Sequence, residues 1–141
     1  MGESNIKPAT EADIYKMQSL WQSTPGLGVG PGDDEDSLKT FLKRNPTTCL
    51  VLMDDDQLIG TVLGGFDGRR GYIYHLAVHS DYQKKGYGKH LLNRALLELK
   101  ALGAKKIHLF VLRDNENAIN FYVYNNWKLR GDIQVLSWDD T

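Results

Sequence analysis

The seven residues from Gln83 to Lys89, Gln-Lys-Lys-Gly-Tyr-Gly-Lys, are the part of the sequence best suited to bind an anion. They follow an apolar stretch that ends at Val78 and precede a segment with helical periodicity, which predicts a loop that leads from a strand into a helix. The first amides of a helix have no partner within it, glycines let a ligand approach the backbone closely, and lysines add positive charge. The residues alone leave two readings open, a diphosphate site and an ordinary tight turn.

The elements that must position this loop follow from hydrophobic periodicity. Apolar residues spaced three and four apart predict helices, and β-branched stretches between Gly and Asp residues predict strands. In chain order, we predict a strand at 6–9, a helix that starts at Thr10 and Asp13, a helix after Asp33–Asp36, strands at 47–53, 58–66 and 72–79, a helix at 88–102 that Gly103 ends, a strand at 106–112, a helix at 115–125, and a closing strand or hairpin at 127–138. The three consecutive strands predict a sheet that grows as a meander.

A stretch rich in glycine and proline, residues 25–32, separates the first two predicted helices. Glycines admit positive φ and prolines remove backbone donors, so no regular structure is expected there. Phosphate-binding glycine loops follow a strand, whereas this stretch follows a helix. We therefore interpret it as a linker or a substrate lid, with a dinucleotide site as the alternative.

Bulk properties exclude several classes of function. The chain has 141 residues, enough for one domain of ordinary size, and we expect a single domain over residues 1–141. The formal net charge of -1 lacks the basic excess of a nucleic-acid-binding protein. No apolar stretch reaches the roughly 18 residues of a membrane span, and the N-terminus lacks the apolar part of a signal peptide. We expect a cytoplasmic protein with no nucleic-acid or membrane partner.

Cys49 is the single cysteine of the chain and lies in the apolar run 49–53. One cysteine excludes an internal disulfide and a cysteine-based metal cluster, and we expect no metal. We interpret Cys49 as a small buried hydrophobic residue, with a nucleophile as the alternative.

Two motifs, in order along the chain, resemble those of a known family. Gln83-Lys84-Lys85-Gly86-Tyr87-Gly88 matches the Gln/Arg-x-x-Gly-x-Gly/Ala motif of GNAT acetyltransferases, and Leu76-Ala77-Val78 resembles the family's splayed strand. Downstream, Asn115-Glu116-Asn117-Ala118-Ile119-Asn120-Phe121-Tyr122 resembles its Asn-x-x-Ala-x-x-Phe/Leu-Tyr helix. The resemblance covers essentially the whole chain. It implies a GNAT-like α+β (mixed αβ) fold with a single central, mostly antiparallel sheet of about six to seven strands flanked by about four helices.

The resemblance implies acetyl-CoA as co-substrate and assigns residues to it. Backbone groups of Leu76, Ala77 and Val78 would pair with the pantetheine arm as though the arm were another strand. The residues that would hold the pyrophosphate are Gln83, Lys84, Lys85, Gly86, Tyr87, Gly88 and Lys89. From the second motif, the residues that would contact the pantetheine or the thioester are Asn115, Ala118, Phe121 and Tyr122.

Tyr122 is the catalytic residue that the resemblance implies. In direct transfer a neutral amine attacks the acetyl carbonyl, backbone N–H groups stabilise the oxyanion, and the departing thiolate needs a proton. Tyr122 would give that proton as general acid. The residues themselves also allow a second interpretation, simple core packing beside Phe121.

The end of the second motif departs from the family pattern. Asn126-Trp127 stands where members often have Gly-Phe. Asparagine tolerates the left-handed conformation better than most residues, so we expect the helix to stop there all the same.

The base that deprotonates the amine has no obvious candidate. Some relatives carry a glutamate on a central strand, and the corresponding positions here are Tyr72 and Phe110. The candidate bases that remain are His75, His108 and Tyr74, each with a structural role as the alternative.

We expect an N-acetyltransferase that acts on a primary amine of a small molecule or a protein. Acidic runs at 33–36 and 54–56 would attract a cationic amine, or would simply be solvated turns. Two other functions stay open: a CoA-binding sensor or interaction module with weak or no acceptor chemistry, and a generic nucleotide-phosphate site. Aromatic residues near Trp127 and Trp138 would suit a homodimer or would pack on their own core.

Overall fold

The structure, a computed structural model, describes residues 5–140, and the chain divides into two compact units. One unit ends at Phe110 and the other begins at Val111. Each unit has its own secondary structure. In the part of the chain that is described, no helix is long and apolar enough to cross a membrane.

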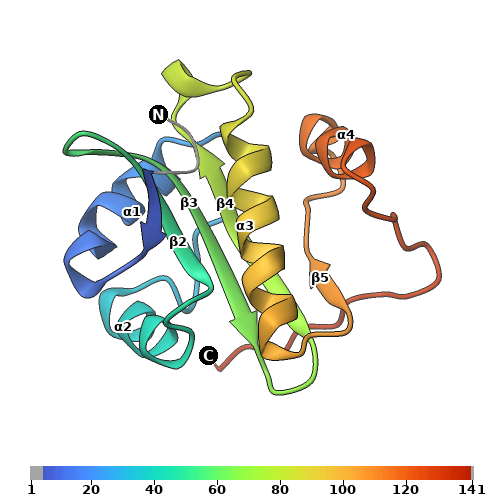
Figure 1. Cartoon of the computed structure of the whole chain (residues 1–141). Helices are drawn as coiled ribbons and strands as arrows, with labels where there is room; N and C mark the ends of the chain where they lie inside the picture. Colours follow the sequence, from blue (N-terminus) through green and yellow to red (C-terminus); the bar gives the residue numbers. More distant parts are fainter. Residues whose placement is uncertain (1–4, 141) are drawn as a thin grey trace. The chain divides into compact units, whose positions relative to one another are not determined.

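Within residues 5–110, a five-stranded sheet forms the centre of the first unit (Figure 1). Its strands are β1 (Ile6–Pro8), β2 (Cys49–Asp54), β3 (Gln57–Phe66), β4 (Gly71–Val78) and β5 (Ile107–Leu109). They lie side by side in chain order; the first three pairings are antiparallel, and β4 pairs with β5 in parallel. The predicted meander is confirmed.

The sheet departs from the expected fold class in strand number and direction. The described residues form five strands rather than six to seven, and one parallel pairing makes the sheet mixed rather than mostly antiparallel. β5 has three residues, where 106–112 is predicted as a strand. It pairs only with residues 71–73 of β4, because β4 changes course at a bulge beyond them.

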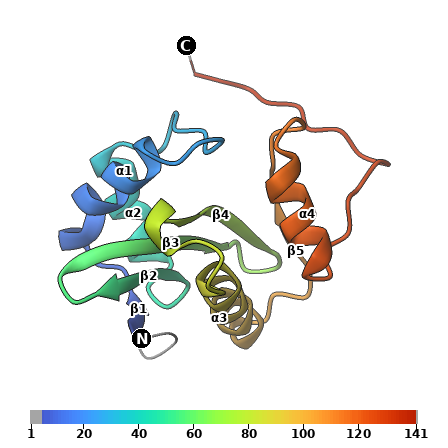
Figure 2. The same ribbon diagram turned by 90° about the horizontal axis from the view of Figure 1, so that it is seen from above.

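Helices cover both faces of this sheet. α1 (Ile14–Gln22) and α2 (Glu35–Arg44) lie on one face, and α3 (Tyr87–Leu102) lies on the other (Figure 2). Short 3₁₀ turns precede α1 at Glu11–Asp13 and follow β4 at Ser80–Tyr82. The predicted helix start is confirmed, since the Thr10 N–H donates to Asp13 Oδ2 at 2.9 Å. The predicted end of α3 at Gly103 is also confirmed, and Gly103 is left-handed with a φ of 109°.

The apolar periodicity of the helices predicts inner faces, and nearly all of those side chains are buried. They are Ile14, Met17, Leu20 and Trp21 in α1, and Leu91, Leu92, Ala95 and Leu99 in α3. Leu96 has the same spacing in α3 and is only partly buried. Cys49 lies on β2 with 1% of its surface exposed, and burial raises the pKa of its thiol to about 12. A thiol that stays protonated is a poor nucleophile, so the interpretation of Cys49 as a buried hydrophobic residue is confirmed.

Within residues 111–140, the second unit contains a single helix, α4 (Glu116–Tyr124). Asn126 follows it in the left-handed conformation, with a φ of 73°, and the Trp127 N–H donates to the Tyr122 carbonyl oxygen at 2.9 Å. This bond closes the C-terminal turn of the helix. The helix stop predicted for Asn126 is therefore confirmed.

The strand or hairpin predicted at 127–138 is wrong, because residues 127–140 form neither helix nor strand. The apolar residues that suggested it are exposed: Leu129, Ile133, Val135, Leu136 and Trp138. A strand requires a partner along its edge, and periodicity within one segment does not show whether a partner is present.

Candidate functional site

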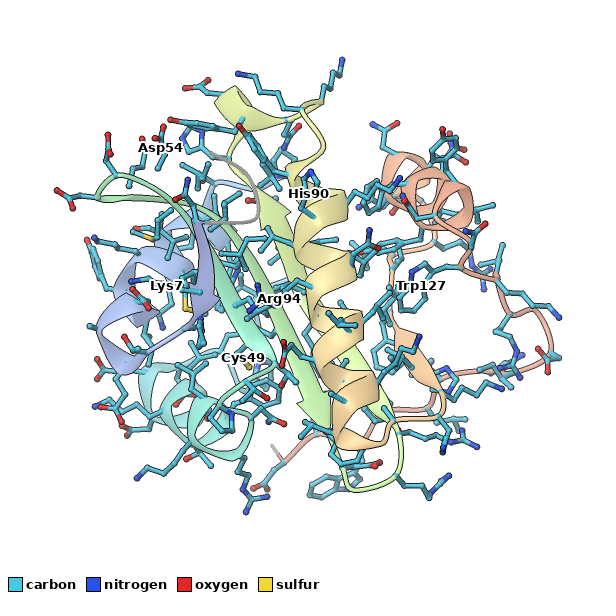
Figure 3. All side chains as sticks on the ribbon, in the orientation of Figure 1. Lys7, Cys49, Asp54, His90, Arg94 and Trp127 are labelled. Carbon is cyan, nitrogen blue, oxygen red and sulfur yellow. The ribbon has the colours of Figure 1, made fainter. Side chains whose placement is uncertain are left out.

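The turn between β4 and α3 presents backbone amides without helical partners. Gly86 is the N-cap of α3 with a φ of 86°, which glycine adopts without strain, and no side chain caps this helix. The His90 N–H donates to the Gly86 carbonyl oxygen at 3.1 Å, one turn into the helix. The amides of residues 87–89 come before that turn is complete and have no carbonyl to donate to within the helix. Figure 3 shows His90 at this end of α3.

Interactions outside the glycines hold the turn in shape. Gln83 Nε2 donates to the Val78 carbonyl oxygen at 2.9 Å and ties the turn to the end of β4. Lys84 has a φ of 63°, which is uncommon for a residue with a Cβ. The Tyr82 hydroxyl donates to Asp54 Oδ2 at 2.5 Å, and this bond raises the pKa of Tyr82. The interpretation of Asp54 as a turn residue gave no indication of that contact.

One edge of β4 has no partner strand beyond Ile73. On the β3 side the pairing continues to Val78, whereas on the β5 side it ends where Ile73 meets Leu109. Within the described residues, no strand pairs with 74–78 on that side. Backbone groups along such an edge pair with an extended chain that reaches them. The predicted pantetheine segment thus lies on a free edge that leads straight into the amide-rich turn.

A bulge turns β4 just where this edge begins. The β3–β4 pairing shifts between Thr61 and Leu63, so that His75 and Leu76 together lie opposite Val62. His75 has a φ of 49°, a strained value for a residue with a side chain. Strain of this kind persists only where the surroundings hold it in place.

Two side chains hold the bulge from other elements. Thr61 Oγ1 donates to the His75 carbonyl oxygen at 2.8 Å. Trp21 Nε1, from α1, donates to Thr61 Oγ1 at 2.9 Å in the buried interior. The course of β4 is therefore fixed by a chain of hydrogen bonds that reaches α1.

The second motif forms α4 and its cap. Asn115 Oδ1 accepts the Ala118 N–H at 3.2 Å, which uses the oxygen of the side-chain amide and not its NH₂ group. Tyr122 packs edge-on against Phe121 and Trp127, with ring centroids 5.2 Å and 5.7 Å away. Burial raises the pKa of Tyr122 to about 12. Its hydroxyl therefore keeps its proton at neutral pH and can donate it.

The predicted site residues fall into two groups. Residues 76–78 and 83–89 follow one another along β4, the turn and the start of α3 in the first unit. Those of the second motif, Asn115, Ala118, Phe121 and Tyr122, belong to α4 and its cap in the second unit. The meeting of the two groups around one ligand stays a prediction.

Comparisons with known proteins show which family the chain belongs to. The sequence pattern of the acetyltransferase (GNAT) family matches residues 14–124. The chain belongs to the GNAT family of acetyltransferases. An acetyltransferase of Pectobacterium atrosepticum is 38% identical to this GNAT protein over 117 residues, which make up 83% of this chain and 82% of the relative.

Solved structures agree with the GNAT fold. Ard1 from Thermoplasma volcanium superposes with a TM-score of 0.78 at 18% identity, over 89% of this chain and 83% of that one. The PaiA N-acetyltransferase from Thermoplasma acidophilum, in complex with coenzyme A, gives a TM-score of 0.77 at 20% identity, over 89% of each chain. At these identities the likeness shows the fold alone.

Two of the candidate bases of this GNAT protein are poor ones. Burial is the main cause of the raised pKa of Tyr74, and the neighbouring Tyr72 adds to it. The phenol of Tyr74 therefore stays protonated at neutral pH. His108 Nε2 lies 3.5 Å from Arg70 Nη1, where the guanidinium faces the nitrogen that would have to take a proton. A guanidinium only donates hydrogen bonds.

The third candidate, His75, has a partner that the sequence does not reveal. Its Nε2 lies 2.8 Å from Asp33 Oδ1. Asp33 is 42 residues away and belongs to an acidic run that reads as a helix start, so no spacing pattern connects the two. The pair arises because the loop before α2 passes over the bulge in β4.

Proposed function

We propose that this GNAT protein transfers the acetyl group of acetyl-CoA to a primary amine. The observation that carries the proposal is the free edge of β4, which runs from the bulge into a turn with unpartnered amides. The amides of a pantetheine arm suit a strand edge, and a diphosphate suits a helix start. CoA carries both groups in one molecule. A GNAT protein with the same fold has been solved with coenzyme A.

Each group of residues takes one part of this ligand. Backbone groups of residues 76–78 pair with the pantetheine arm, and the amides and lysines of residues 83–89 hold the diphosphate. Asn115 donates from its NH₂ group to the arm, and Ala118 and Phe121 pack along it. We also propose that the two units act together as one GNAT domain.

Tyr122 supplies the proton that the sulfur needs when the C–S bond breaks. With a pKa of about 12, the Tyr122 hydroxyl is a weaker acid than a thiol, whose pKa is about 8.5. Complete proton transfer from the isolated hydroxyl to a thiolate is therefore uphill by about 5 kcal/mol. The transfer is therefore concerted with C–S cleavage, and Tyr122 regains a proton from the attacking nitrogen. The chemistry depends on alignment of the hydroxyl as much as on its acidity.

A substitution in α4 tests this role. Tyr122→Phe removes the hydroxyl, and we expect kcat for thiol release to fall by about 10²-fold or more while CoA affinity stays within about twofold. Tyr124→Phe is the matched control, since Tyr124 lies on the same helix with 83% of its surface exposed, and should leave both unchanged. The acceptor panel is putrescine, tyramine, a lysine-containing peptide and a peptide with a free α-amine. Full kcat in Tyr122→Phe would reject Tyr122 as the donor.

A second function has one observation in its favour, the aromatic residues Tyr72 and Phe110 at the strand positions where some relatives carry a glutamate. Such a protein would bind CoA as a sensor or interaction module and would not acetylate an acceptor. Tight CoA binding without thiol release from any amine of the panel is the outcome that favours this function.

A further inference from the structure

His75 and Asp33 form a shielded pair at the bulge of β4. Their side chains are 15% and 14% exposed, and His75 Nε2 lies 2.8 Å from Asp33 Oδ1. The imidazole also packs against Trp21 of α1, with ring centroids 4.5 Å apart. The pair therefore lies on the face of the sheet that α1 covers, opposite α3.

The carboxylate of Asp33 determines which nitrogen of the neutral imidazole carries the hydrogen. An ionised carboxylate can only accept, so Nε2 of His75 is the donor and Nδ1 carries the lone pair. In the described residues Nδ1 has no hydrogen-bond partner. No polar side-chain atom described there is both sealed from solvent and unpartnered, so Nδ1 is open to water or a ligand.

Asp33 accepts a hydrogen bond at its side chain from the glycine-rich loop and another at its backbone from α1. Its Oδ2 accepts the Gly30 N–H at 3.0 Å, within the glycine-rich loop. Its carbonyl oxygen accepts from Gln18 Nε2 of α1 at 3.0 Å. The carboxylate is thus oriented by groups other than His75, as a carboxylate that fixes an imidazole must be.

The position of His75 relates the pair to the proposed reaction. His75 immediately precedes the free edge formed by residues 76–78, and its carbonyl oxygen is fixed by Thr61. The bulge at His75, where φ is 49°, interrupts the regular alternation of the strand. An imidazole with an open lone pair therefore lies one residue from the segment proposed to hold the thioester arm.

We propose that His75 is the general base of the acetyl transfer and that Asp33 is its positioning residue. This rests on the proposed function. A catalytic dyad of this kind needs an imidazole with one nitrogen free and the other bound to a carboxylate, which is the arrangement of Asp33 and His75. The bound carboxylate also stabilises the imidazolium that forms.

The nitrogen of the acceptor loses two protons during the step. His75 Nδ1 takes one proton from the alkylammonium acceptor and later releases it to solvent. The freed nitrogen lone pair forms the C–N bond, and the electron pair of the C–S bond leaves with sulfur. The second proton of the nitrogen passes to the thiolate through Tyr122, so the products are the amide and CoA thiol.

The charged group in contact with the imidazole is Asp33. The neighbours from α1 and β3, Trp21 and Thr61, are neutral, and burial keeps the phenol of Tyr74 protonated. Asp33 is therefore the group that stabilises an imidazolium at this position.

Asp33→Asn separates a catalytic role from a structural one. The asparagine oxygen can still accept the Gly30 N–H, while its NH₂ group faces Nε2 and forces the hydrogen onto Nδ1. We expect ¹⁵N NMR of the imidazole to show Nδ1 unprotonated in the wild type and protonated in Asp33→Asn. A pair that only fastens the loop would tolerate this conservative change better than Asp33→Ala.

Kinetics give the second measurement. For the amines of the panel that the wild type acetylates, kcat at pH 7 should fall by about 10²-fold in both Asp33→Asn and His75→Asn, with CoA affinity within about twofold. Asparagine suits the positive φ at position 75. The deficit should shrink as pH rises, because the free amine then forms without a base. Asp36→Asn, an exposed residue of the same acidic run, should change neither value.

The results separate the two proposals. Wild-type acetylation with full kcat in Asp33→Asn, or an unchanged imidazole tautomer in that variant, overturns the dyad and leaves the proposed function standing. A wild type that releases no thiol with any amine overturns the acetyltransferase proposal and the dyad with it.

Discussion

The N-termini of α2 and α3 both have amides without helical partners, but only α2 supplies its own negative charge to them. In α2, Asp34 Oδ2 accepts the Ser37 N–H at 3.1 Å, and Glu35 and Asp36 add negative charge in the first turn. In α3, Gly86 has no side chain to offer and the first turn holds no acidic residue. A helix start attracts negative charge through its free amides. Because α2 carries its own anion and α3 does not, the start of α3 fits the role proposed for it, the binding of a diphosphate.

The largest expected effect comes from giving α3 the arrangement of α2. Gly86→Asp places a carboxylate at the α3 N-cap, and we expect CoA affinity, measured by calorimetry, to fall by about 100-fold or more through repulsion of the diphosphate. Aspartate tolerates a positive φ better than most residues.

Gly68→Asp is the matched control for that substitution. Gly68 also has a positive φ, 95°, and a Cβ there would meet nothing within 4 Å. It should leave CoA affinity within about twofold, since it changes the net charge equally. Equal affinity losses in the two variants would show that charge alone, and not the helix start, is responsible.

A tenfold effect should distinguish the caps of α2 and α4. Both helices begin with a side chain that accepts an amide of the first turn, Asp34 in α2 and Asn115 in α4. Asn115→Ala should cost about 1 kcal/mol of unfolding free energy and weaken CoA binding by up to about tenfold.

Asp34→Ala should lower the urea midpoint without affecting CoA binding, because the α2 cap has no proposed contact with the ligand. If Asn115→Ala lowers stability and leaves the CoA dissociation constant unchanged, Asn115 is a cap and nothing more.

The smallest expected effect is the stability that the Asp34 cap of α2 loses at low pH. The hydrogen bonds from Ser37 lower the pKa of Asp34, so this carboxylate contributes stability above its ordinary value of about 4 and loses that contribution as pH falls through the lower folded value. Asp34→Asn keeps a good cap but has no proton to bind.

The urea midpoint of the wild type should therefore fall more steeply from about pH 5 to about pH 3 than that of Asp34→Asn. Parallel decreases in the two proteins would mean that the Asp34 cap does not respond to acid.

Local patterns predicted most of the elements and the turn at Gly86. Periodicity was sufficient for α1 and α3, whose inner faces are each buried by several apolar residues, and for the motif residues that follow one another along the chain. These features depend on near neighbours in the sequence.

Features that depend on distant partners were not predictable in the same way. The bulge at His75 requires Thr61 and Trp21, and the contact with Asp33 spans 42 residues. Neither leaves a spacing pattern. The segment 127–138 shows the reverse error, since its alternation is that of a strand and yet no strand forms in the described residues. Pairing is a property of two segments, and a pattern describes only one.

Backbone amide NMR during a CoA titration tests the comparison most directly. If α3 and the free edge of β4 hold CoA, the amides of residues 76–78 and 83–89 should shift on CoA addition, and those at the start of α2, residues 35–37, should not. CoA binding that leaves both site segments unshifted, or no binding at all, would contradict the proposed site.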